Sequence, residues 1–243
     1  MVRTFLQDHE QQPLPIVLVP GLMCSARLYG EQIPALWRFG PVLVADHTRD
    51  DSMAGIARRI LAAAPGDRFA LVGLSLGGYI AFEIMRQAPE RVAKLALLDT
   101  SARSDTPEQT ERRHAEIALA EGGRYSEVPD GRFPSFVHPS RGNDQALLGL
   151  VRLMAEETGP EAFVRQQKAI MSRPDSRPDL AGVRCPTLVL VGDGDEPTPP
   201  ERAAEIADGI AGARLVTVPD CGHLSTLERP QQVSEALAEW LQA

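Results

Sequence analysis

The chain has 243 residues, of which 43% are apolar and 24% charged, and its formal net charge is −8. A chain of this length can form a single α/β domain and bury roughly 70–75% of its unfolded surface. The acidic balance, with 25 basic against 33 acidic residues and no Lys/Arg tract, argues against binding to nucleic acid or to anionic membranes.

The cysteines and the N-terminal segment predict a cytoplasmic location. Cys24, Cys185 and Cys221 form no closely spaced pair, so we expect no disulfide framework and a reducing compartment. Residues 1–15 are polar and contain no apolar segment typical of a signal peptide. The chain also has no run of eighteen consecutive apolar residues, the length that predicts a membrane-spanning helix.

In the first hundred residues, short apolar runs alternate with amphipathic segments. The runs predict strands at 3–7, 16–19, 42–45, 69–74 and 92–98. Helices are predicted from 28 to about 40, at 52–64 and from 76 to about 88, and Ser52 is the predicted cap of the second. This alternation indicates a parallel sheet covered by helices on both faces.

The pattern changes between residues 101 and 183. Helices are predicted at 107–121, 143–158 and 160–172, and the stretch 122–142 is rich in Pro and Gly. We interpret residues 101–183, here called the cap segment, as a helical insertion over the sheet. The alternating pattern then returns, with strands at 187–191 and 214–218 and helices at 200–211 and 230–241. The predicted core therefore comprises residues 1–100 and 184–243.

The pentapeptide Gly73-Leu-Ser75-Leu-Gly77 lies where the strand at 69–74 gives way to a helix. Glycines two positions on either side of the serine allow strand and helix to pass closely, and the turn exposes the serine hydroxyl at the carboxyl edge of the sheet. The helix N-terminus beside it favours negative charge. A simple Gly-Ser turn is the alternative, but the strand-to-helix context favours a nucleophile. No Lys-Ser/Thr pair follows the glycines, which disfavours a phosphate-binding loop.

A serine nucleophile needs a base, usually a histidine that is oriented by a carboxylate. His223 lies in the loop directly after the strand at 214–218, and this loop is at the same sheet edge as Ser75. His223 is therefore the predicted base, and a surface loop residue is the alternative. His47 also follows a strand, but we interpret it as an ordinary loop residue.

The acid is expected in the loop after the strand at 187–191, which contains Asp193, Asp195 and Glu196. We choose Asp195 and interpret Asp193 and Glu196 as solvated charges or turn formers. Asp99, at the end of the strand at 92–98, is the alternative acid. The chain order serine, acid, histidine favours the later loop.

Two backbone N–H groups are needed to bind the oxyanion of an acyl-transfer intermediate. Leu76, directly after the serine, supplies one of them at its helix N-terminus. Leu22, in the loop after the strand at 16–19, supplies the second, and Gly21 is expected to permit the sharp turn of this loop. A plain strand terminator is the alternative interpretation of this Pro-Gly-Leu sequence.

Four motifs in this order resemble those of the α/β-hydrolase superfamily, over nearly the whole chain. The motifs are Val19-Pro-Gly-Leu22, Gly73-Leu-Ser-Leu-Gly-Gly78, Val191-Gly-Asp-Gly-Asp195 and Cys221-Gly-His-Leu-Ser-Thr-Leu-Glu-Arg-Pro230. The resemblance implies that Ser75 is the nucleophile, Asp195 the acid, His223 the base, and Leu22 and Leu76 the oxyanion donors, with no cofactor and no metal. Within the superfamily the chain is most similar to small carboxylesterases and enol-lactonase-like hydrolases.

The chain departs from the family pattern in two places. Many relatives have His where this chain has Pro20, so the support given by that histidine is missing. The N-terminus is too short for the family's opening hairpin, so we expect a mostly parallel sheet of about six to seven strands.

The resemblance implies hydrolysis of a small-molecule carboxylic ester through an acyl-enzyme. Enol-lactone hydrolysis, thioester hydrolysis, carbon–carbon bond hydrolysis and acyl transfer use the same triad and stay open, as does a small-molecule receptor on the same scaffold. Dehalogenases and epoxide hydrolases would have Asp in place of Ser75. Six apolar cap residues could line the substrate pocket or could simply pack on the sheet, namely Leu147, Leu148, Val151, Met154, Phe163 and Met171. Cys24 and Cys221 are expected to be packing residues.

Overall fold

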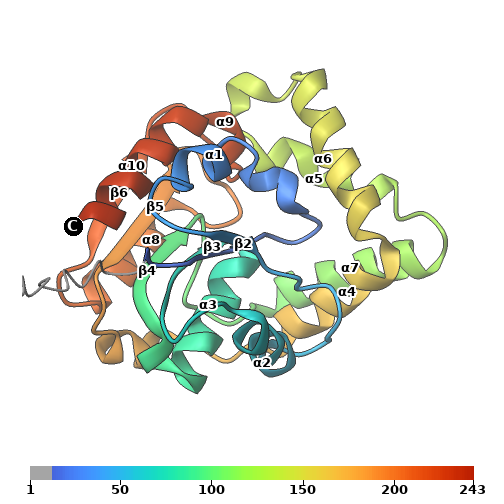
Figure 1. The fold of residues 1–243 in the computed structure, drawn as a ribbon. Coiled ribbons are helices and arrows are strands. Elements are labelled where there is room, and N and C mark those ends of the chain that lie inside the picture. The colour runs from blue at the N-terminus through green and yellow to red at the C-terminus, as the bar shows by residue number, and fades with distance from the viewer. Residues whose placement is uncertain (1–12) are drawn as a thin grey trace, which may run out of the picture.

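The computed structural model describes residues 13–243. Their strands form one parallel six-stranded sheet in the order β2-β1-β3-β4-β5-β6 (Figure 1). The strands are β1 (Ile16–Val19), β2 (Val42–Val44), β3 (Phe69–Leu74), β4 (Val92–Leu98), β5 (Thr187–Gly192) and β6 (Arg214–Val218). The predicted α/β fold and sheet are thus confirmed, and the predicted strand at 3–7 lies outside the described residues.

The three strands β1, β3 and β5 are buried along their whole length. A parallel strand in the middle of such a sheet is covered on both faces by helices, so its sequence is a continuous apolar run. At one edge of the sheet, β6 is instead mostly exposed. This difference explains why the apolar runs were sufficient to locate the central strands.

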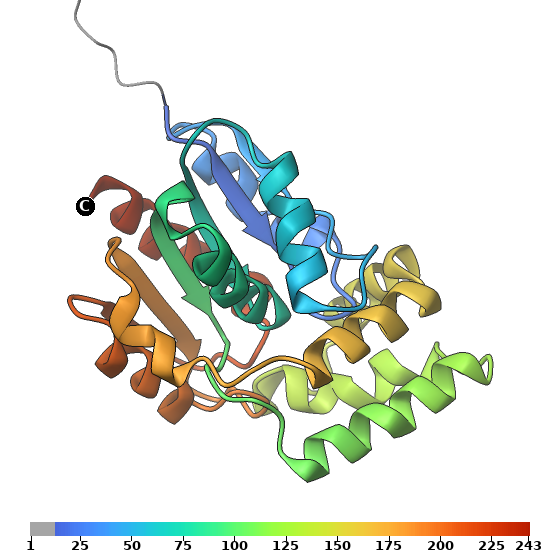
Figure 2. The ribbon, with the colours of Figure 1, turned by 90° about the horizontal axis from the view of Figure 1, so that it is seen from below.

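Helices pack on both faces of the sheet. They are α1 (Gln32–Leu36), α2 (Met53–Ala63), α3 (Leu76–Gln87), α8 (Pro200–Gly209), α9 (Ser225–Glu228) and α10 (Pro230–Gln242). α1 and α10 lie against each other on one face, and α2, α3 and α8 cover the other (Figures 1 and 2). Ser52 caps α2 as predicted, because its hydroxyl accepts a hydrogen bond from the N–H of Gly55 at 3.2 Å.

The predicted helix from 28 to about 40 is instead divided into two short helices, of which the second ends at Leu36. A 3₁₀-helix occupies Ala26–Tyr29, and α1 begins at Gln32. Gly30 and Glu31 separate them, and Gly30 forms the C-cap of the first helix. The apolar spacing of this segment was recognised correctly, but the break at a glycine was not.

The cap segment contains four α-helices that lie beyond the carboxyl ends of the strands (Figure 2). They are α4 (Pro107–Glu121), α5 (Glu127–Phe136), α6 (Gln145–Thr158) and α7 (Pro160–Met171). The sequence did not predict α5, because this helix has two prolines and a glycine. It forms because Val128, Phe133 and Phe136 are buried against the rest of the protein, and such packing outweighs weak helix propensity.

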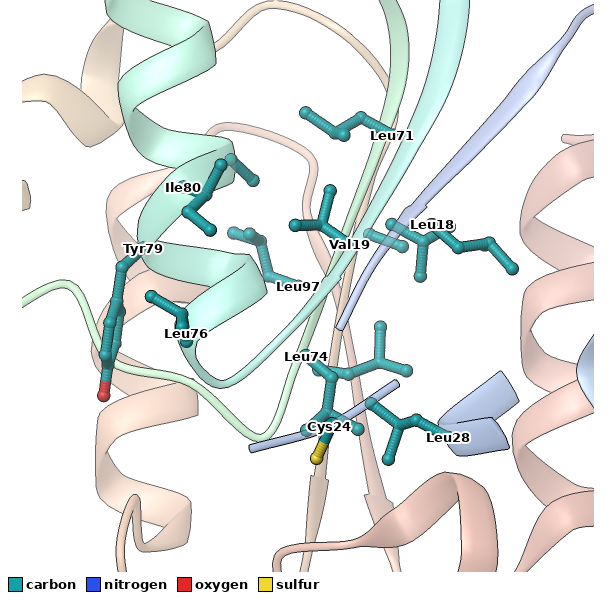
Figure 3. Packing of buried hydrophobic residues seen from close by; sticks show 14 of the residues in the cluster. Leu18, Val19, Cys24, Leu28, Leu71, Leu74, Leu76, Tyr79, Ile80 and Leu97 are labelled. Carbon is teal, nitrogen blue, oxygen red and sulfur yellow. The ribbon is translucent and has the colours of Figure 1, made fainter. Parts of the chain in front are cut away.

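The N-terminus of α3 is fixed by the packing of its first turns on the sheet. Leu76 and Ile80 of α3 are fully buried and point toward the strands that carry Val19 and Leu97 (Figure 3). A rigid helix start at this place holds the residue before it, Ser75, in a defined position. Within residues 13–243, no helix is both long enough and apolar enough to cross a membrane.

Candidate active site

Ser75 lies on a strained turn between β3 and α3. Its backbone has φ 56° and ψ −112°, a region that non-glycine residues rarely adopt. The glycines on either side are required by close backbone approach: a Cβ on Gly73 would lie 2.3 Å from the carbonyl oxygen of Gly77. A Cβ on Gly77 would lie 2.0 Å from the carbonyl oxygen of Val19. The spacing of this motif is therefore set by backbone contacts, as the sequence predicts.

The imidazole of His223 lies between the hydroxyl of Ser75 and the carboxylate of Asp195. Its Nε2 is 2.9 Å from Ser75 Oγ, and its Nδ1 is 2.9 and 3.0 Å from the two carboxylate oxygens of Asp195. His223 and Asp195 are 4% and 3% exposed. The fold thus brings together three side chains that are up to 148 positions apart in the sequence.

This geometry determines which nitrogen of neutral His223 carries the proton. A carboxylate can only accept, so Nδ1–H donates to Asp195 and the lone pair of Nε2 is directed at the Ser75 hydroxyl. In this tautomer the ring can take a proton from serine, and the adjacent carboxylate stabilises the imidazolium that results.

The alternative acid, Asp99, has a different environment. Its carboxylate accepts the N–H of Gly192 at 3.1 Å and is hydrogen-bonded to the hydroxyl of Ser225. Among the described residues no hydrogen bond joins Asp99 to His223. Burial, and then the charge of Asp195, raise the pKa of Asp99 well above its ordinary value.

Two further residues hold the acid loop in place. Thr198 donates its N–H to one oxygen of Asp195 at 2.9 Å and its hydroxyl to the other at 2.8 Å. Asp193 is exposed, as expected of a solvated charge, and it also accepts the N–H of Cys221 at 3.1 Å, which joins the acid loop to the histidine loop. Glu196 is exposed, as expected. A threonine three residues after an aspartate is a common turn pattern, and this spacing could have identified Thr198 from the sequence as a partner of Asp195.

The histidine loop is also hydrogen-bonded to the cap segment. The carbonyl of Phe136, at the end of α5, accepts the N–H groups of His223 and Leu224 at 3.0 and 3.2 Å. Glu228 accepts the N–H groups of Gly222 and His138, each at 2.9 Å. Burial raises the pKa of Glu228. The position of the imidazole therefore depends on α5, the helix that the sequence did not predict.

The two predicted oxyanion donors belong to the loop after β1 and to the first turn of α3. Leu76 is the first residue of α3, so its N–H has no acceptor inside the helix. The N–H of Leu22 has no acceptor within residues 13–243. Leu22 lines the same pocket as Ser75, and Leu76 directly follows Ser75 in the sequence. The arrangement leaves two backbone donors available for a developing negative charge.

The loop that carries Leu22 is held from two sides. His47 donates from Nε2 to the carbonyl oxygen of Gly21 at 3.0 Å, and the side-chain oxygen of Gln166 on α7 accepts the N–H of Met23 at 3.2 Å. Met23 has φ 60°. The left-handed residue of the turn is therefore Met23. Gly21, which was expected to permit the sharp turn, has no left-handed backbone, and a Cβ added to it would meet only ordinary contacts of 3.5 Å or more.

His47 is thus a support of the oxyanion loop, and its interpretation as an ordinary loop residue was wrong. It is 2% exposed, and burial lowers its pKa, which favours the neutral ring. A carbonyl oxygen can only accept, so Nε2 carries the hydrogen. His47, in the loop after β2, therefore supports the oxyanion loop in place of the family histidine that is missing at position 20.

The pocket above Ser75 is lined mainly by the site loops and by polar cap residues. Its lining residues are Gly21, Leu22, Cys24, Leu74, Ser75, Tyr79, Gln109, Arg112, Arg113, Arg132, Phe136, Ile170, Pro197, His223 and Leu224. None of the six apolar cap residues proposed from the sequence (Leu147, Leu148, Val151, Met154, Phe163 and Met171) is among them. Their helical spacing instead reflects packing, since Leu147, Val151, Met154 and Phe163 are buried.

The cysteines near the site have the properties of packing residues. Burial raises the pKa of the Cys24 thiol to about 12, and it also raises the pKa of the Cys221 thiol. Thiols with such pKa values carry almost no thiolate at neutral pH. Within residues 13–243, no group of three or more His, Cys, Asp or Glu side chains is arranged to hold a metal ion.

Comparison with known proteins agrees with the fold and with the site motifs. The model of the alpha/beta hydrolase family matches residues 16–236. The chain is 30% identical over 177 residues to the putative non-heme bromoperoxidase BpoC of Mycobacterium tuberculosis. This match covers 70% of this chain and 66% of that relative. It is 28% identical over 240 residues to the putative carbamate hydrolase RutD of Azorhizobium caulinodans, with coverage of 92% and 89%.

Comparison with solved structures also supports an alpha/beta hydrolase fold. The esterase from Thermogutta terrifontis, solved with malate bound, superimposes with a TM-score of 0.86 and 30% identity, and the match covers 95% of this chain and 90% of that one. The enol-lactonase from Burkholderia xenovorans has a TM-score of 0.85 at 23% identity, with coverage of 97% and 94%, which shows a shared fold. The chain therefore belongs to the alpha/beta hydrolase family.

Proposed function

We propose that this protein is a serine hydrolase that cleaves small carboxylic esters through an acyl-enzyme intermediate. The observation that carries the proposal is the position of the His223 imidazole, which is hydrogen-bonded to Ser75 Oγ on one side and to Asp195 on the other. A serine hydroxyl is a weak nucleophile on its own, and this arrangement provides the base that activates it.

In the first half of the reaction, Ser75 Oγ attacks the ester carbonyl carbon while His223 Nε2 takes the hydroxyl proton. The carbonyl oxygen becomes an oxyanion that is bound by the N–H groups of Leu22 and Leu76. When the tetrahedral intermediate collapses, the carbon–oxygen bond to the alcohol breaks and the imidazolium protonates the leaving oxygen. Asp195 keeps the ring oriented and stabilises its positive charge.

In the second half, a water molecule replaces the alcohol. His223 removes a proton from this water, and the hydroxide attacks the acyl carbon. The second tetrahedral intermediate is bound by the same two N–H groups and releases the carboxylic acid as Ser75 recovers its proton. One oxyanion donor typically contributes about 2.7–4 kcal/mol to transition-state stabilisation, so the position of the Leu22 loop matters for the rate.

The size of the pocket supports a small substrate. About 50 Å³ of it is open to water-sized groups, compared with the roughly 10–15 Å³ that one water requires by a similar measure. This volume favours an acyl chain of a few carbon atoms. Relatives described as an esterase and as a pimeloyl-[acyl-carrier protein] methyl ester esterase support ester cleavage in particular.

The test is turnover of p-nitrophenyl acetate and butyrate by the wild-type protein and by Ser75→Ala, together with labelling by a fluorophosphonate. We expect labelling and turnover in the wild type and the loss of both in Ser75→Ala, with activity falling by several orders of magnitude. Near-normal turnover by Ser75→Ala would overturn the proposal. A receptor on this scaffold would instead bind a ligand tightly and release p-nitrophenol very slowly.

We further infer that the protein acts in the cytoplasm on a small molecule, with no nucleic-acid or membrane partner. Its cysteines are free, as expected for a reducing compartment. Its net charge of −8 disfavours association with polyanions. Fractionation of the native host with an antibody to this chain would test the location.

A further inference from the structure

The candidate pocket contains an excess of positive charge. Arg112 and Arg113 of α4 and Arg132 of α5 all line the pocket that also contains Ser75. A fourth guanidinium, that of Arg173, lies 4.1 Å from the ring centroid of Tyr79, another lining residue. Three arginines that line one pocket, with a fourth beside it, are unexpected in a chain with a net charge of −8.

Only part of this charge is neutralised by neighbouring carboxylates. Arg113 and Arg173 share a single carboxylate, that of Asp105, at 2.6 and 2.7 Å. Arg132 is paired with Glu116, whose second oxygen also accepts a hydrogen bond from Gln167. The side chains of these pairs are nearly buried, so the three paired arginines are held in place by the cap.

Arg112 differs from the other three because it forms no ion pair within residues 13–243. Four guanidinium groups therefore face two carboxylates in this cluster, and the local balance is +2. Arg112 lines the pocket and is otherwise exposed to solvent. Its partial burial, and then the charge of Arg132, lower its pKa, although a guanidinium stays protonated at neutral pH. An anion bound at Arg112 would relieve this repulsion.

We propose that the natural substrate is a carboxylic ester that carries a second, free carboxylate, and that Arg112 binds this carboxylate. The inference rests on the proposed function, because the ester end must reach Ser75 in the same pocket. A guanidinium matches the planar carboxylate with two parallel N–H donors, which fixes the orientation of the substrate as well as its affinity. The three paired arginines make the surrounding field positive and so favour the anion.

The small pocket indicates a short half-ester of a dicarboxylic acid. The matched substrates are monomethyl glutarate and methyl butyrate, which differ in their charge and are similar in length. We expect kcat/KM of the wild-type protein to be about 10–100-fold higher for monomethyl glutarate, as one charge-assisted hydrogen-bonded contact implies. Turnover can be followed by titration of the acid released.

Arg112→Gln should lower kcat/KM for monomethyl glutarate about tenfold or more, mainly through KM, and bring its ratio to methyl butyrate close to one. Arg112→Lys should retain part of the preference, because it keeps the charge but loses the paired donors. Arg124→Gln is the control, because it removes the same charge from an exposed cap residue that does not line the pocket. It should leave the ratio unchanged. An unchanged ratio in Arg112→Gln would overturn the proposal.

A binding measurement separates this inference from the proposed function. Calorimetry with monomethyl glutarate and the Ser75→Ala variant requires no turnover, and we expect binding that is lost in Ser75→Ala/Arg112→Gln. If methyl butyrate is hydrolysed in a Ser75-dependent manner but no half-ester preference is found, the proposed substrate class is wrong. The proposal that the protein is a serine hydrolase is then retained. If neither ester is hydrolysed but Arg112-dependent binding persists, the hydrolase proposal is wrong and the anion site stands. Stronger competition by inorganic phosphate than by glutarate would overturn the assignment of a carboxylate.

Discussion

The Nε2 atom of His47 lies 3.0 Å from the carbonyl oxygen of Gly21, and this contact joins the loop after β2 to the loop after β1. The neighbouring residue Leu22 supplies the N–H that we assign to the oxyanion hole. On the other side, Gln166 of the cap accepts the N–H of Met23. A buried ring and a cap side chain thus set the direction of one backbone donor.

The first prediction concerns this support. His47→Phe removes the donor and retains a ring of similar size, so the Leu22 N–H should lose its alignment. We expect kcat to fall about tenfold or more, but by less than the roughly 10²–10³-fold that follows loss of an oxyanion donor itself. KM should change little, because the contact acts in the transition state.

Steady-state kinetics of His47→Phe, His47→Gln and His114→Gln would test this role. His47→Gln retains a side-chain donor and should recover part of the rate. His114 is exposed on α4 and should be neutral. Full kcat in His47→Phe would show that the contact is only structural.

The second prediction concerns the choice between the two acids. Asp195→Asn should lower kcat by about 10⁴-fold, the loss found for the equivalent change in a serine protease, because an amide no longer selects the correct imidazole tautomer. Asp99→Asn should retain most of the activity, since Asp99 is hydrogen-bonded to Gly192 and Ser225 and not to His223. The reverse order of activities would reassign the acid.

The third prediction concerns stability against pH. The pKa of Asp99 is raised by burial in the folded state, above the value of about 3.9 expected in the unfolded chain. Its contribution to the free energy of unfolding is therefore fully present below pH ~3.9 and is lost as the pH rises through the folded-state pKa. Asn at position 99 does not titrate and has no such pH dependence. The free energy of unfolding of Asp99→Asn relative to that of the wild type should therefore increase with pH.

Asp193 provides a comparison with the opposite sign. The hydrogen bond from the N–H of Cys221 lowers the pKa of Asp193, so its contribution is present above the unfolded-state pKa and is lost toward acid. Denaturation by urea at a series of pH values should give opposite slopes for Asp99→Asn and Asp193→Asn relative to wild type. Equal slopes would contradict both assignments.

The fourth prediction concerns the turn at Ser75. In Gly77→Ala the new Cβ would lie 2.0 Å from the carbonyl oxygen of Val19, a backbone atom that cannot move aside easily. We expect a loss of at least about 3 kcal/mol in the free energy of unfolding, at the upper end of the range for overpacking. Urea denaturation would measure this loss.

The matched control is Gly149→Ala, in the exposed face of α6. An added Cβ there meets no atom within 4 Å. Alanine should therefore stabilise the protein by about 0.5–1 kcal/mol, through its better helix propensity. A Gly77→Ala variant as stable as Gly149→Ala would be incompatible with the close contact between β1 and α3.

Much of the fold could be predicted from the sequence, because local patterns carry its information. Continuous apolar runs located the strands of the sheet, including β3 and β5, which are buried on both faces. The glycines around Ser75 identified the strand-to-helix turn, and the predicted positions of Ser75, Asp195 and His223 all fall in loops at one sheet edge. Topology alone brings the carboxyl ends of parallel strands together.

The residues that support and shape the site depended on tertiary structure. α5 forms despite its prolines because the folded protein buries Val128, Phe133 and Phe136. The free energy gained by this burial comes from tertiary packing and is not reflected in local helix propensity. His47 looked like an ordinary loop residue because its partner, the Gly21 carbonyl, is 26 positions away. The sequence by itself therefore determined which residues can carry out the chemistry. Only tertiary packing, of the core loops against one another and of the cap against the sheet, decided how they are oriented and that Arg112 lines the pocket without a partner among the described residues.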